Sequence, residues 1–238
     1  MVLSIEIAVA KTHKYASRDS GDTVETVERP TGGVSVVLVD GQGSGHAAKS
    51  LSMMVSSKAV TLLKEGVRDG GVARGTHDFL HAFRHGKVSA TLDIVSVDLA
   101  TSTVVITRNN GVPYYVVGDE SGYRASESVS GPIGLYRHTR PAVDQFPCER
   151  GLNVIVFSDG IATAGVRKGS PFNPIAYANQ HQLPLGSVQE LADGLLKAAI
   201  EADEGRPSDD MTVVALSLVA SETRQPIRRQ YVSLPLPG

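Results

Sequence analysis

The strand-like runs of this sequence stand next to one another instead of alternating singly with helical runs, and this order limits the folds open to the chain. Each run is rich in β-branched residues and has a length typical of a strand. Neighbouring strands of this kind favour antiparallel sheets covered by helices over a doubly wound parallel sheet, so we expect an α+β fold. The expected strands are 4–10, 34–39, 89–98, 102–108, 113–118, 152–158 and 211–219.

Three helical runs can cover such sheets. In each of them apolar residues recur at the spacing of one helix face. The last run opens on Ser187 with Glu190 three residues later, which is the pattern of a capping box. The expected helices span about 46–65, about 73–84 and about 187–203.

The length of 238 residues suits one good-sized domain with a substantial core. We expect this domain to span residues 1–220, with 221–238 as a C-terminal tail or an extra edge strand. In the tail, Ile, Tyr, Val and Leu alternate with polar residues, which allows either an edge strand or a docking segment.

Charge and cysteine content exclude several classes of protein. The formal net charge is -2 and no run of Lys or Arg exceeds two, so we expect neither a nucleic-acid nor a membrane partner. The one cysteine, Cys148, allows no disulfide framework and no cysteine-based zinc site, which fits a reducing compartment. The first residues lack the pattern of a signal peptide, and no apolar stretch approaches the roughly 18 residues that span a bilayer. The expected location is the cytoplasm.

Acidic residues stand at the ends of three expected strands. Asp40 ends the apolar run of VVLVDGQGSGHAA, where a glycine-rich turn leads into a helical pattern. The stretch NVIVFSDG repeats this design with Asp159. A third acidic point, Asp209 and Asp210 in RPSDDMTVVAL, lies immediately before a strand. These points can meet where a sheet brings the strand ends together.

An Asp-Gly pair on its own predicts a turn or a helix cap more often than a ligand. Asp69-Gly70 and Asp193-Gly194 supply a comparison within the chain, because neither follows a buried-looking strand. Two such pairs that close apolar strands, together with the acidic pair that opens another, favour a site. Crowded carboxylates repel one another and lose solvation unless a cation lies between them. Mg²⁺ or Mn²⁺ suits all-oxygen ligands, whereas zinc would favour nearby His or Cys.

The glycine-rich turn does not match the common nucleotide-binding loops. Gly41, Gly43 and Gly45 form G-x-G-x-G, which differs from the dinucleotide fingerprint, and no Gly-Lys-Ser/Thr closes the loop as in a P-loop. Because it has no side chain, Gly41 instead allows a backbone carbonyl to turn inward as a further oxygen ligand.

Seven segments together resemble the metal-dependent Ser/Thr protein phosphatases of the type 2C class, also called PPM-type. More narrowly, their order and spacing are similar to the bacterial branch that acts in sporulation and stress-response signalling. The resemblance covers roughly residues 5–220, and seven ordered segments are more specific than any one of them. The segments are SGD (20–22), VVLVDGQGSGHAA (36–48), SATLDIVSVD (89–98), RNNGVPYYV (108–116), GPIGL (131–135), VIVFSDGIATA (154–164) and SDDMTVVAL (208–216).

The resemblance implies a central antiparallel β-sandwich flanked by helices in four layers, α-β-β-α, with two Mn²⁺ or Mg²⁺ ions at one end. Transferred position by position, Asp40 would bridge both ions and Gly41 would contribute its carbonyl oxygen. Asp159 and Asp209 would hold one ion, and these two form the catalytic set with Asp40. Asp22 would complete the metal site through a metal-bound water.

Other positions follow or depart from the family pattern. Asp209 is favoured over Asp210, because the first acid of the pair matches the family ligand. Eukaryotic members have a His directly after the Asp-Gly, which is thought to protonate the leaving oxygen. Here that position is Gln42, so water or another group would have to serve. An acid that helps to bind a third metal is replaced around Val112. Arg18 is the candidate phosphate-binding residue, with a solvated surface charge as the alternative.

The implied function is hydrolysis of phosphoserine or phosphothreonine on a small bacterial signalling protein, such as an anti-sigma-factor antagonist or a stress-complex component. Two metal ions would activate a water for in-line attack, without a covalent enzyme intermediate. Two alternatives stay open. One is a binding-only pseudophosphatase, which rests on Gln42. The other is a different two-metal phosphoester hydrolase, although such enzymes usually recruit His ligands and none of the seven histidines has a suitable spacing to an Asp.

Two further expectations concern residues outside the acidic set. Asp93 and Asp98 belong to a strand that alternates with apolar residues, and we expect both to face solvent. Residues 165–186, rich in Pro, Gly and Asn, lie between two expected ligands. They form either a flap that shapes substrate access or a loop with a short helix.

Overall fold

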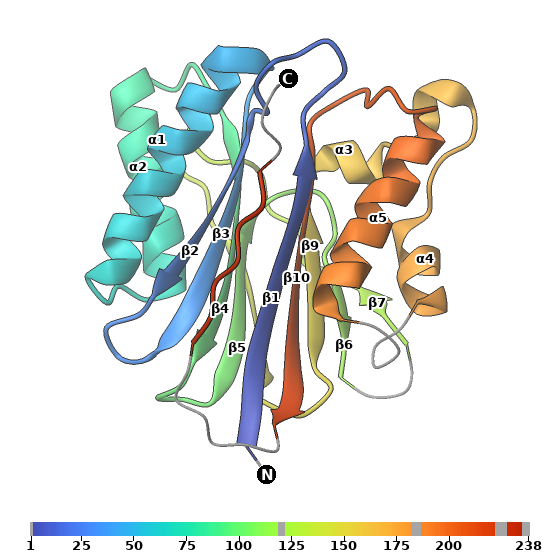
Figure 1. Ribbon diagram of the computed structural model, residues 1–238. Coiled ribbons are helices and arrows are strands. Elements are labelled where there is room, and N and C mark those ends of the chain that lie inside the picture. Colours follow the sequence, from blue (N-terminus) through green and yellow to red (C-terminus); the bar gives the residue numbers. More distant parts are fainter. Residues whose placement is uncertain (1, 119–121, 182–186, 222–227, 235–238) are drawn as a thin grey trace.

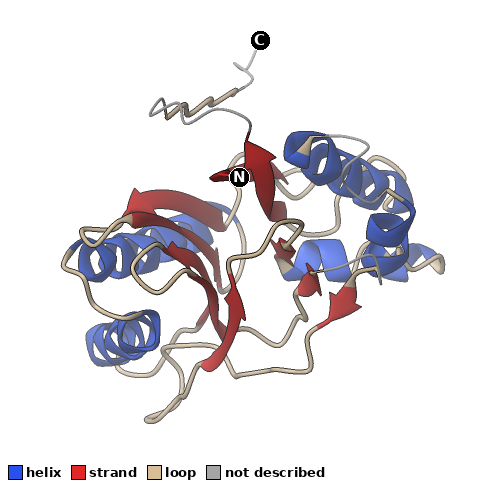
Figure 2. Cartoon of the chain, turned by 90° about the horizontal axis from the view of Figure 1, so that it is seen from below, coloured by secondary structure: helices blue, strands red, loops and turns tan. Residues whose placement is uncertain are grey.

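Two antiparallel sheets face each other in the computed structural model, and helices cover both outer faces (Figure 1). The structure describes residues 2–118, 122–181, 187–221 and 228–234. The view from below shows the sheets packed face to face between the two groups of helices (Figure 2). The expected α+β sandwich with α-β-β-α layers is confirmed.

The first sheet has five strands in an order that joins the two halves of the chain. β1 pairs with β10 along its whole length, from Val2 opposite Ser221 to Thr12 opposite Met211. The order is β1 (Val2–Thr12), β10 (Met211–Ser221), β9 (Asn153–Phe157), β6 (Tyr115–Val117) and β7 (Arg124–Ala125).

The second sheet is a meander of four consecutive strands with one later strand at its edge. All of its pairings are antiparallel, so successive strand ends alternate between the two ends of the sandwich. The order is β2 (Asp22–Glu28), β3 (Gly33–Gly41), β4 (Ala90–Asp98), β5 (Thr103–Asn109) and β8 (Ala142–Pro147).

The helices divide between the two outer faces (Figure 1). Two long helices, α1 (Gly45–Lys64) and α2 (Asp69–Arg84), cover the second sheet. The first sheet is covered by α3 (Asp159–Ala162), the 3₁₀ turn η1 (Val166–Lys168), α4 (Pro174–Gln180) and α5 (Val188–Ala202). At the start of α5 the expected capping box between Ser187 and Glu190 is present. None of these helices is long and apolar enough to cross a lipid bilayer.

Three apolar layers hold the four structural layers together. β3 shows how one strand serves two of them, because its apolar residues alternate between the two faces of the sheet. Val37 and Val39 pack against α1 and α2, whereas Val36 and Leu38 pack against the opposite sheet. Burial on both faces explains why this strand reads as a continuous apolar run in the sequence.

All seven expected strands and all three expected helices are present, with ends shifted by a few residues. Three strands were not expected: β2, β7 and β8. β2 and β8 are the edge strands of the second sheet, and polar residues interrupt the apolar pattern of both. Residues 165–181 form η1 and α4, a connection with short helices, whereas 182–186 lie outside the described residues.

The expectation that Asp93 faces solvent is wrong. Its side chain is fully buried between the two sheets, where it forms an ion pair with the equally buried Arg108. Its second oxygen accepts a hydrogen bond from Asn110 Nδ2 at 2.8 Å. Asp98, by contrast, is partly exposed and accepts a hydrogen bond from the backbone of Ala100 at 2.8 Å in the following turn. A buried carboxylate is tolerated at Asp93 because a cation and an amide satisfy it.

The C-terminal tail is described only in part. Residues 228–234 contain no strand, and Tyr231 is 89% exposed. Arg228 forms an exposed ion pair with Glu28 of β2 at 2.7 Å. Figure 2 shows this part of the tail standing away from the two sheets.

Candidate active site

Antiparallel pairing brings the first two acidic residues together. β2 begins at Asp22, β3 ends one residue after Asp40, and these two residues are direct partners in the β2–β3 ladder. The pleat also directs Asp40 to the inner face of its sheet, in phase with Val36 and Leu38. Its carboxylate therefore lies at one end of the space between the two sheets.

The first sheet delivers its acids to the same end. β9 ends beside the start of β10, and Ser158 joins them by two hydrogen bonds of 3.0 Å with Thr212. Asp159 follows as the first residue of α3, and Asp209 lies two residues before β10. In Figure 1 this end of the sandwich is at the top, near α3.

A cavity of about 380 Å³ opens between these strand ends. Its lining brings together four of the predicted site residues: Asp40, Gly41, Asp159 and Asp209. The other lining residues are Gln42, Gly43, Ser89, Ala90, Thr91, Pro132 and Asp210.

Two predicted residues do not line the cavity. Asp22 is buried beside it, and Arg18 is exposed in the loop that joins β1 to β2. The predicted role of Arg18 in phosphate binding stays a prediction.

Asp22 has an unusual set of partners for a fully buried carboxylate. One oxygen accepts a hydrogen bond from Thr212 Oγ1 at 2.5 Å. The other, Oδ1, has no hydrogen-bond partner among the described residues. Burial is the main cause that raises the pKa of Asp22 to about 6. Its backbone carbonyl accepts hydrogen bonds from the ammonium groups of Lys49 at 3.0 Å and Lys11 at 3.1 Å, which brings two cations behind the acidic cluster.

Two acids that face the cavity, Asp40 and Asp159, also have raised pKa values in the absence of a cation. Burial raises the pKa of Asp40 to about 8, and the negative charges of Asp22, Asp159 and Asp209 add to the effect. Burial likewise raises the pKa of Asp159, followed by repulsion from Asp209. A positive charge in the cavity would reverse this preference, because it stabilises the ionised forms.

The two adjacent acids before β10 have different surroundings. Asp210 is buried, and its two oxygens accept hydrogen bonds of 2.8 Å from the backbone amides of Lys14 and Gly21. It thus fastens both ends of the loop between β1 and β2. Asp209 is more exposed, and its nearest cation is the ammonium group of Lys14 at 3.9 Å. This difference supports Asp209 as the ligand of the pair.

Two glycines allow the backbone to approach closely around the acids. A Cβ atom on Gly41 would lie 2.4 Å from the carbonyl oxygen of Ala48 in α1. A Cβ atom on Gly160 would lie 2.1 Å from the carbonyl oxygen of Asp210. Both contacts are shorter than any real Cβ atom tolerates, so the strand end and the acidic turn can reach the neighbouring helices only through glycine.

Gln42, which occupies the position of the family histidine, ties the cavity wall together. Its side-chain Oε1 accepts hydrogen bonds from the backbone amide of Ser89 at 2.9 Å and from Ser89 Oγ at 3.3 Å. Its backbone amide donates to the Ser89 carbonyl at 3.1 Å. Gln42 therefore holds the residue that leads into β4.

The donor chemistry of this end suits a hard divalent cation. The cavity lining contains carboxylate and backbone oxygens and neither His nor Cys. The unpartnered Asp22 Oδ1 is a buried acceptor that a metal-bound water would satisfy. Within the described ranges, no three His, Cys, Asp or Glu side chains lie close enough together to hold a metal ion as they stand. Mutual repulsion of the acids, and the several waters that Mg²⁺ retains, are compatible with this open arrangement.

Several residues of the site were missed by reasoning from the sequence. Lys11 and Lys49 follow no recognisable motif, because their contact is with a backbone carbonyl. Thr212 carries a weak signal, since it stands three residues after Asp209 in a strand that is otherwise apolar. Ser89 and Pro132 line the cavity because the chain pairs at Ala90 and Ile133, and the local sequence does not predict this long-range pairing.

Comparisons with solved structures agree with this architecture. The PP2C phosphatase domain of the cell fate determinant SpoIIE from Bacillus subtilis, solved with a fragment of its regulatory domain, aligns with a TM-score of 0.78 at 21% identity. The alignment covers 93% of this chain and 65% of that one, so the chain spans just under two thirds of this neighbour.

Two further structures show the same fold. RsbX in complex with magnesium aligns with a TM-score of 0.69 at 15% identity, over 90% of this chain and 95% of that one. The RsbU and RsbW domains of a Mycobacterium tuberculosis protein align with a TM-score of 0.73 at 17% identity, over 92% of this chain and 61% of theirs. At these identities the likeness is one of fold.

The sequence itself supports a closer assignment. Among curated proteins none matches the chain. The family model described as Stage II sporulation protein E (SpoIIE) matches residues 30–219, which is most of the chain and includes all the cavity-lining acids. The resemblance to the sporulation and stress-response branch of the PPM-type phosphatases is thereby confirmed, and the chain belongs to the SpoIIE family.

Proposed function

We propose that this protein is a Mn²⁺- or Mg²⁺-dependent phosphatase that hydrolyses phosphoserine or phosphothreonine on a bacterial signalling protein. One observation carries the proposal. Three acids from two different sheets converge on one open cavity, although their negative charges repel one another: Asp40, Asp159 and Asp209. Such an arrangement is costly for the fold alone and useful where cations and a phosphoryl group bind.

Each residue of the site has a separate task in this proposal. Asp40, Gly41, Asp159 and Asp209 would hold two ions, and Asp22 would accept a hydrogen bond from a metal-bound water through its free Oδ1. When bound, the ions would supply charge for the phosphoryl oxygens and a more acidic water. Asp210 and Gln42 would keep the loop before β2 and the start of β4 in place. Because Gln42 cannot donate an ionisable proton, water or another group would protonate the leaving oxygen.

The relatives support the substrate class and the metal. The solved neighbours include a phosphatase domain of a cell fate determinant, RsbX with magnesium and a structure described as part of the bacterial stressosome. A phosphorylated regulator, such as an anti-sigma-factor antagonist or a stress-complex component, is the corresponding substrate for this chain. Among described residues no helix could span a membrane, which is compatible with a protein substrate in the cytoplasm.

Hydrolysis of p-nitrophenyl phosphate and of a phosphoserine peptide, each with Mn²⁺, Mg²⁺ or EDTA, tests this function. We expect metal-dependent turnover that falls by at least about 100-fold in Asp40→Asn, because the ions would lose their shared ligand. Asp193→Asn is the matched control, since Asp193 also precedes a glycine but is exposed on α5. It should keep wild-type turnover.

Other outcomes would redirect the assignment. Calorimetric binding of Mn²⁺ without turnover of either substrate would favour the binding-only alternative. Hydrolysis of bis-p-nitrophenyl phosphate in preference to the monoester would favour a different two-metal hydrolase. Equal turnover by the wild type and Asp40→Asn would overturn the assignment of the site.

A further inference from the structure

A cluster of exposed basic residues lies beside the cavity, on the side of α2. It consists of two short segments, the end of α2 with the residues that follow it and the loop that leads to β8. All six members are exposed, and we call them the basic rim: Arg84, His85, Lys87, Arg137, His138 and Arg140. The surrounding stretches 79–92 and 128–143 contain no Asp or Glu, although acidic residues outnumber basic ones in the whole chain.

The basic rim is continuous with the cavity wall. Ser89 and Ala90, which line the cavity, follow directly after Lys87 and Val88. On the other segment Pro132 lines the cavity, and Ile133 exchanges two backbone hydrogen bonds of 2.9 and 3.2 Å with Ala90. A polypeptide that presents a side chain to the acids would therefore pass over the rim with its neighbouring residues.

Two histidines of α2 fix the second segment to the helix. His77 Nδ1 accepts a hydrogen bond from the amide of Gly134 at 3.1 Å, and His81 Nδ1 lies 3.1 Å from the carbonyl oxygen of the same residue. Gly134 has a φ of 90°, and a Cβ atom there would lie 2.5 Å from Leu80. Arg84 shares a helix face with His77 and His81, because the spacing is i, i+4 and i+7. The backbone at Gly134, three residues before Arg137, is thus fixed to α2 before any partner binds.

The permanent cations of the rim lack acidic partners. Within the described ranges, no ion pair joins Arg84, Lys87, Arg137 or Arg140 to a carboxylate. Arg29, in contrast, forms an ion pair with Asp69, the first residue of α2. Tyr136, which directly precedes Arg137, is 61% exposed. Unpaired arginines next to an exposed tyrosine are typical of surfaces that bind other proteins.

We propose that the basic rim binds an acidic segment of the phosphoprotein substrate, next to the phosphorylated residue. This inference rests on the proposed function and narrows its substrate class to phosphoproteins with Asp or Glu near the phosphorylation site. Complementary charges at the edge of a binding site raise the association rate of the two partners and favour partners of the right charge. Salt screens these charges and weakens the effect. A protein segment fits better than a nucleic acid, because the chain has a formal net charge of -2 and no run of more than two Lys or Arg residues.

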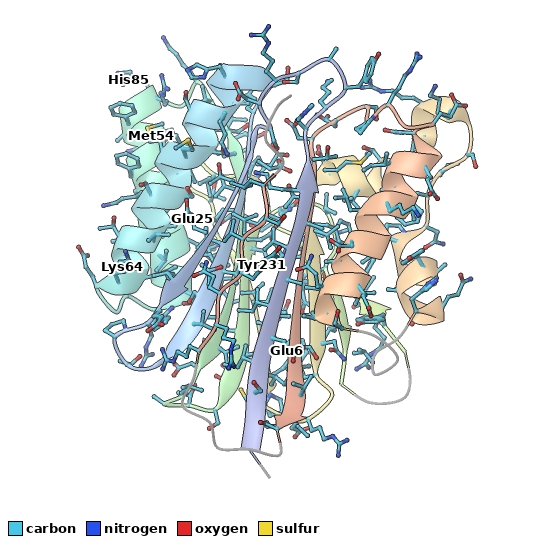
Figure 3. All side chains as sticks on the ribbon, viewed as in Figure 1. Glu6, Glu25, Met54, Lys64, His85 and Tyr231 are labelled. Carbon is cyan, nitrogen blue, oxygen red and sulfur yellow. The ribbon has the colours of Figure 1, made fainter. Side chains whose placement is uncertain are left out.

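The matched variants follow from the fold. The rim pair, Arg84→Glu with Lys87→Glu, reverses the charge of one residue in the last turn of a helix and of one residue in an exposed loop. The control pair, Lys64→Glu with Arg150→Glu, makes the same two charge reversals at the opposite end of the sandwich. Lys64 is in the last turn of α1, and Arg150 precedes β9. Figure 3 shows His85 at one end of the helical layer and Lys64 at the other. Unfolding temperatures establish that both pairs fold.

The first measurement needs neither metal nor activity. A short fluorescent Glu-rich peptide without phosphate is titrated with the protein in EDTA at low salt, beside a Lys-rich peptide and a DNA oligonucleotide. We expect the Glu-rich peptide to bind, and its affinity to fall about 10-fold in the rim pair and not in the control pair. Equal loss in both pairs, or no binding of the acidic peptide, would overturn the proposal. Tighter binding of the oligonucleotide, lost in the rim pair, would assign the surface to nucleic acid instead.

The second measurement connects the rim to turnover. For phosphoserine peptides with Glu or with Lys flanks, the ratio of kcat/KM values should favour Glu flanks in the wild type. The ratio should fall about 10-fold in the rim pair and be unchanged in the control pair. An unchanged ratio in the rim pair would contradict the proposal. If the wild type turns over no substrate, the proposed function fails, whereas the peptide titration still decides whether the rim binds acidic segments.

Discussion

Among single residues, Asp40 illustrates how the candidate site opposes the stability of the fold. Burial and the neighbouring acids raise its pKa to about 8, and burial raises the pKa of Asp22 to about 6. In the unfolded chain both groups would titrate near 3.8. Between pH 4 and pH 8 the folded protein therefore binds more protons than the unfolded chain. Without cations, the contribution of these groups to the free energy of unfolding decreases as the pH rises through this range.

Replacement of Asp40 by Asn should remove most of this dependence. Asn cannot ionise, so at pH 8 in EDTA we expect Asp40→Asn to be more stable than the wild type by on the order of 2 kcal/mol. At pH 5 the difference should be smaller, because the wild-type carboxyl group is then largely protonated. Urea unfolding at both pH values measures the effect. This account would be contradicted if the wild type were more stable at pH 8 than at pH 5 while the stability of Asp40→Asn stayed the same.

The same scale shows what the sequence could and could not predict about the site. Asp40 and Asp159 were identifiable because each ends an apolar strand. Only the family resemblance separated Asp209 from Asp210 in the sequence, and the structure adds that Asp210 accepts hydrogen bonds from two backbone amides. Asp93 was misplaced because alternation describes which residues share a face but not whether that face is buried. Its partner Arg108 stands 15 positions away, so their pairing depends on the β4–β5 register.

At the scale of elements, the junction of β3 and α1 determines how close the acids can come to their covering helix. Gly43 and Gly45 have positive φ angles of 99° and 66°, which allow the chain to turn from the strand into the helix. Gly41 then lies directly against the first turns of α1. The glycine-rich turn that raised the question of nucleotide binding is thus required by the packing of a strand end against a helix.

A methyl group at position 41 should disturb this junction. In Gly41→Ala the new Cβ atom would meet the Ala48 carbonyl oxygen at 2.4 Å, so helix and strand would have to separate. We expect a loss of about 2–3 kcal/mol in the free energy of unfolding, measured by urea denaturation. Gly111→Ala is the control, because a Cβ atom there has no neighbour within 4 Å. Similar losses in both variants would show that the steric argument is wrong.

The predictability of the elements follows from burial. Strands buried on both faces, such as β3 and β9, have unbroken apolar runs that sequence reasoning finds readily. β2 contains two Glu residues in seven positions, and β8 has Asp144 and Gln145 in the middle of its six positions. Their strand conformation depends on pairing with a neighbour rather than on local preference, so it becomes evident only in the assembled sheet.

For the molecule as a whole, metal binding should add to stability, because the proposed ligands come from both sheets. A ligand that binds only the folded state adds about 2.7 kcal/mol at 100 times its Kd. For a domain of this size we expect Mn²⁺ or Mg²⁺ to raise the Tm by about 5–10 °C relative to EDTA. The increase should be much smaller in Asp40→Asn and intact in Asp193→Asn. Scanning calorimetry or dye-based melting measures it, and an equal increase in all three proteins would place the bound ions elsewhere.

The pairing of β1 with β10 has a consequence for synthesis. β1 lies at the edge of its sheet and its ladder partner is made about 200 residues later, so during synthesis β1 stays unpaired until β10 has been made. Asp209 stands just before that late strand. A nascent chain, or a fragment cut before β10, therefore lacks both the closing strand and one acid of the set. Completion of the sandwich therefore also completes the proposed catalytic centre, and an unfinished copy lacks one of the acids proposed for it.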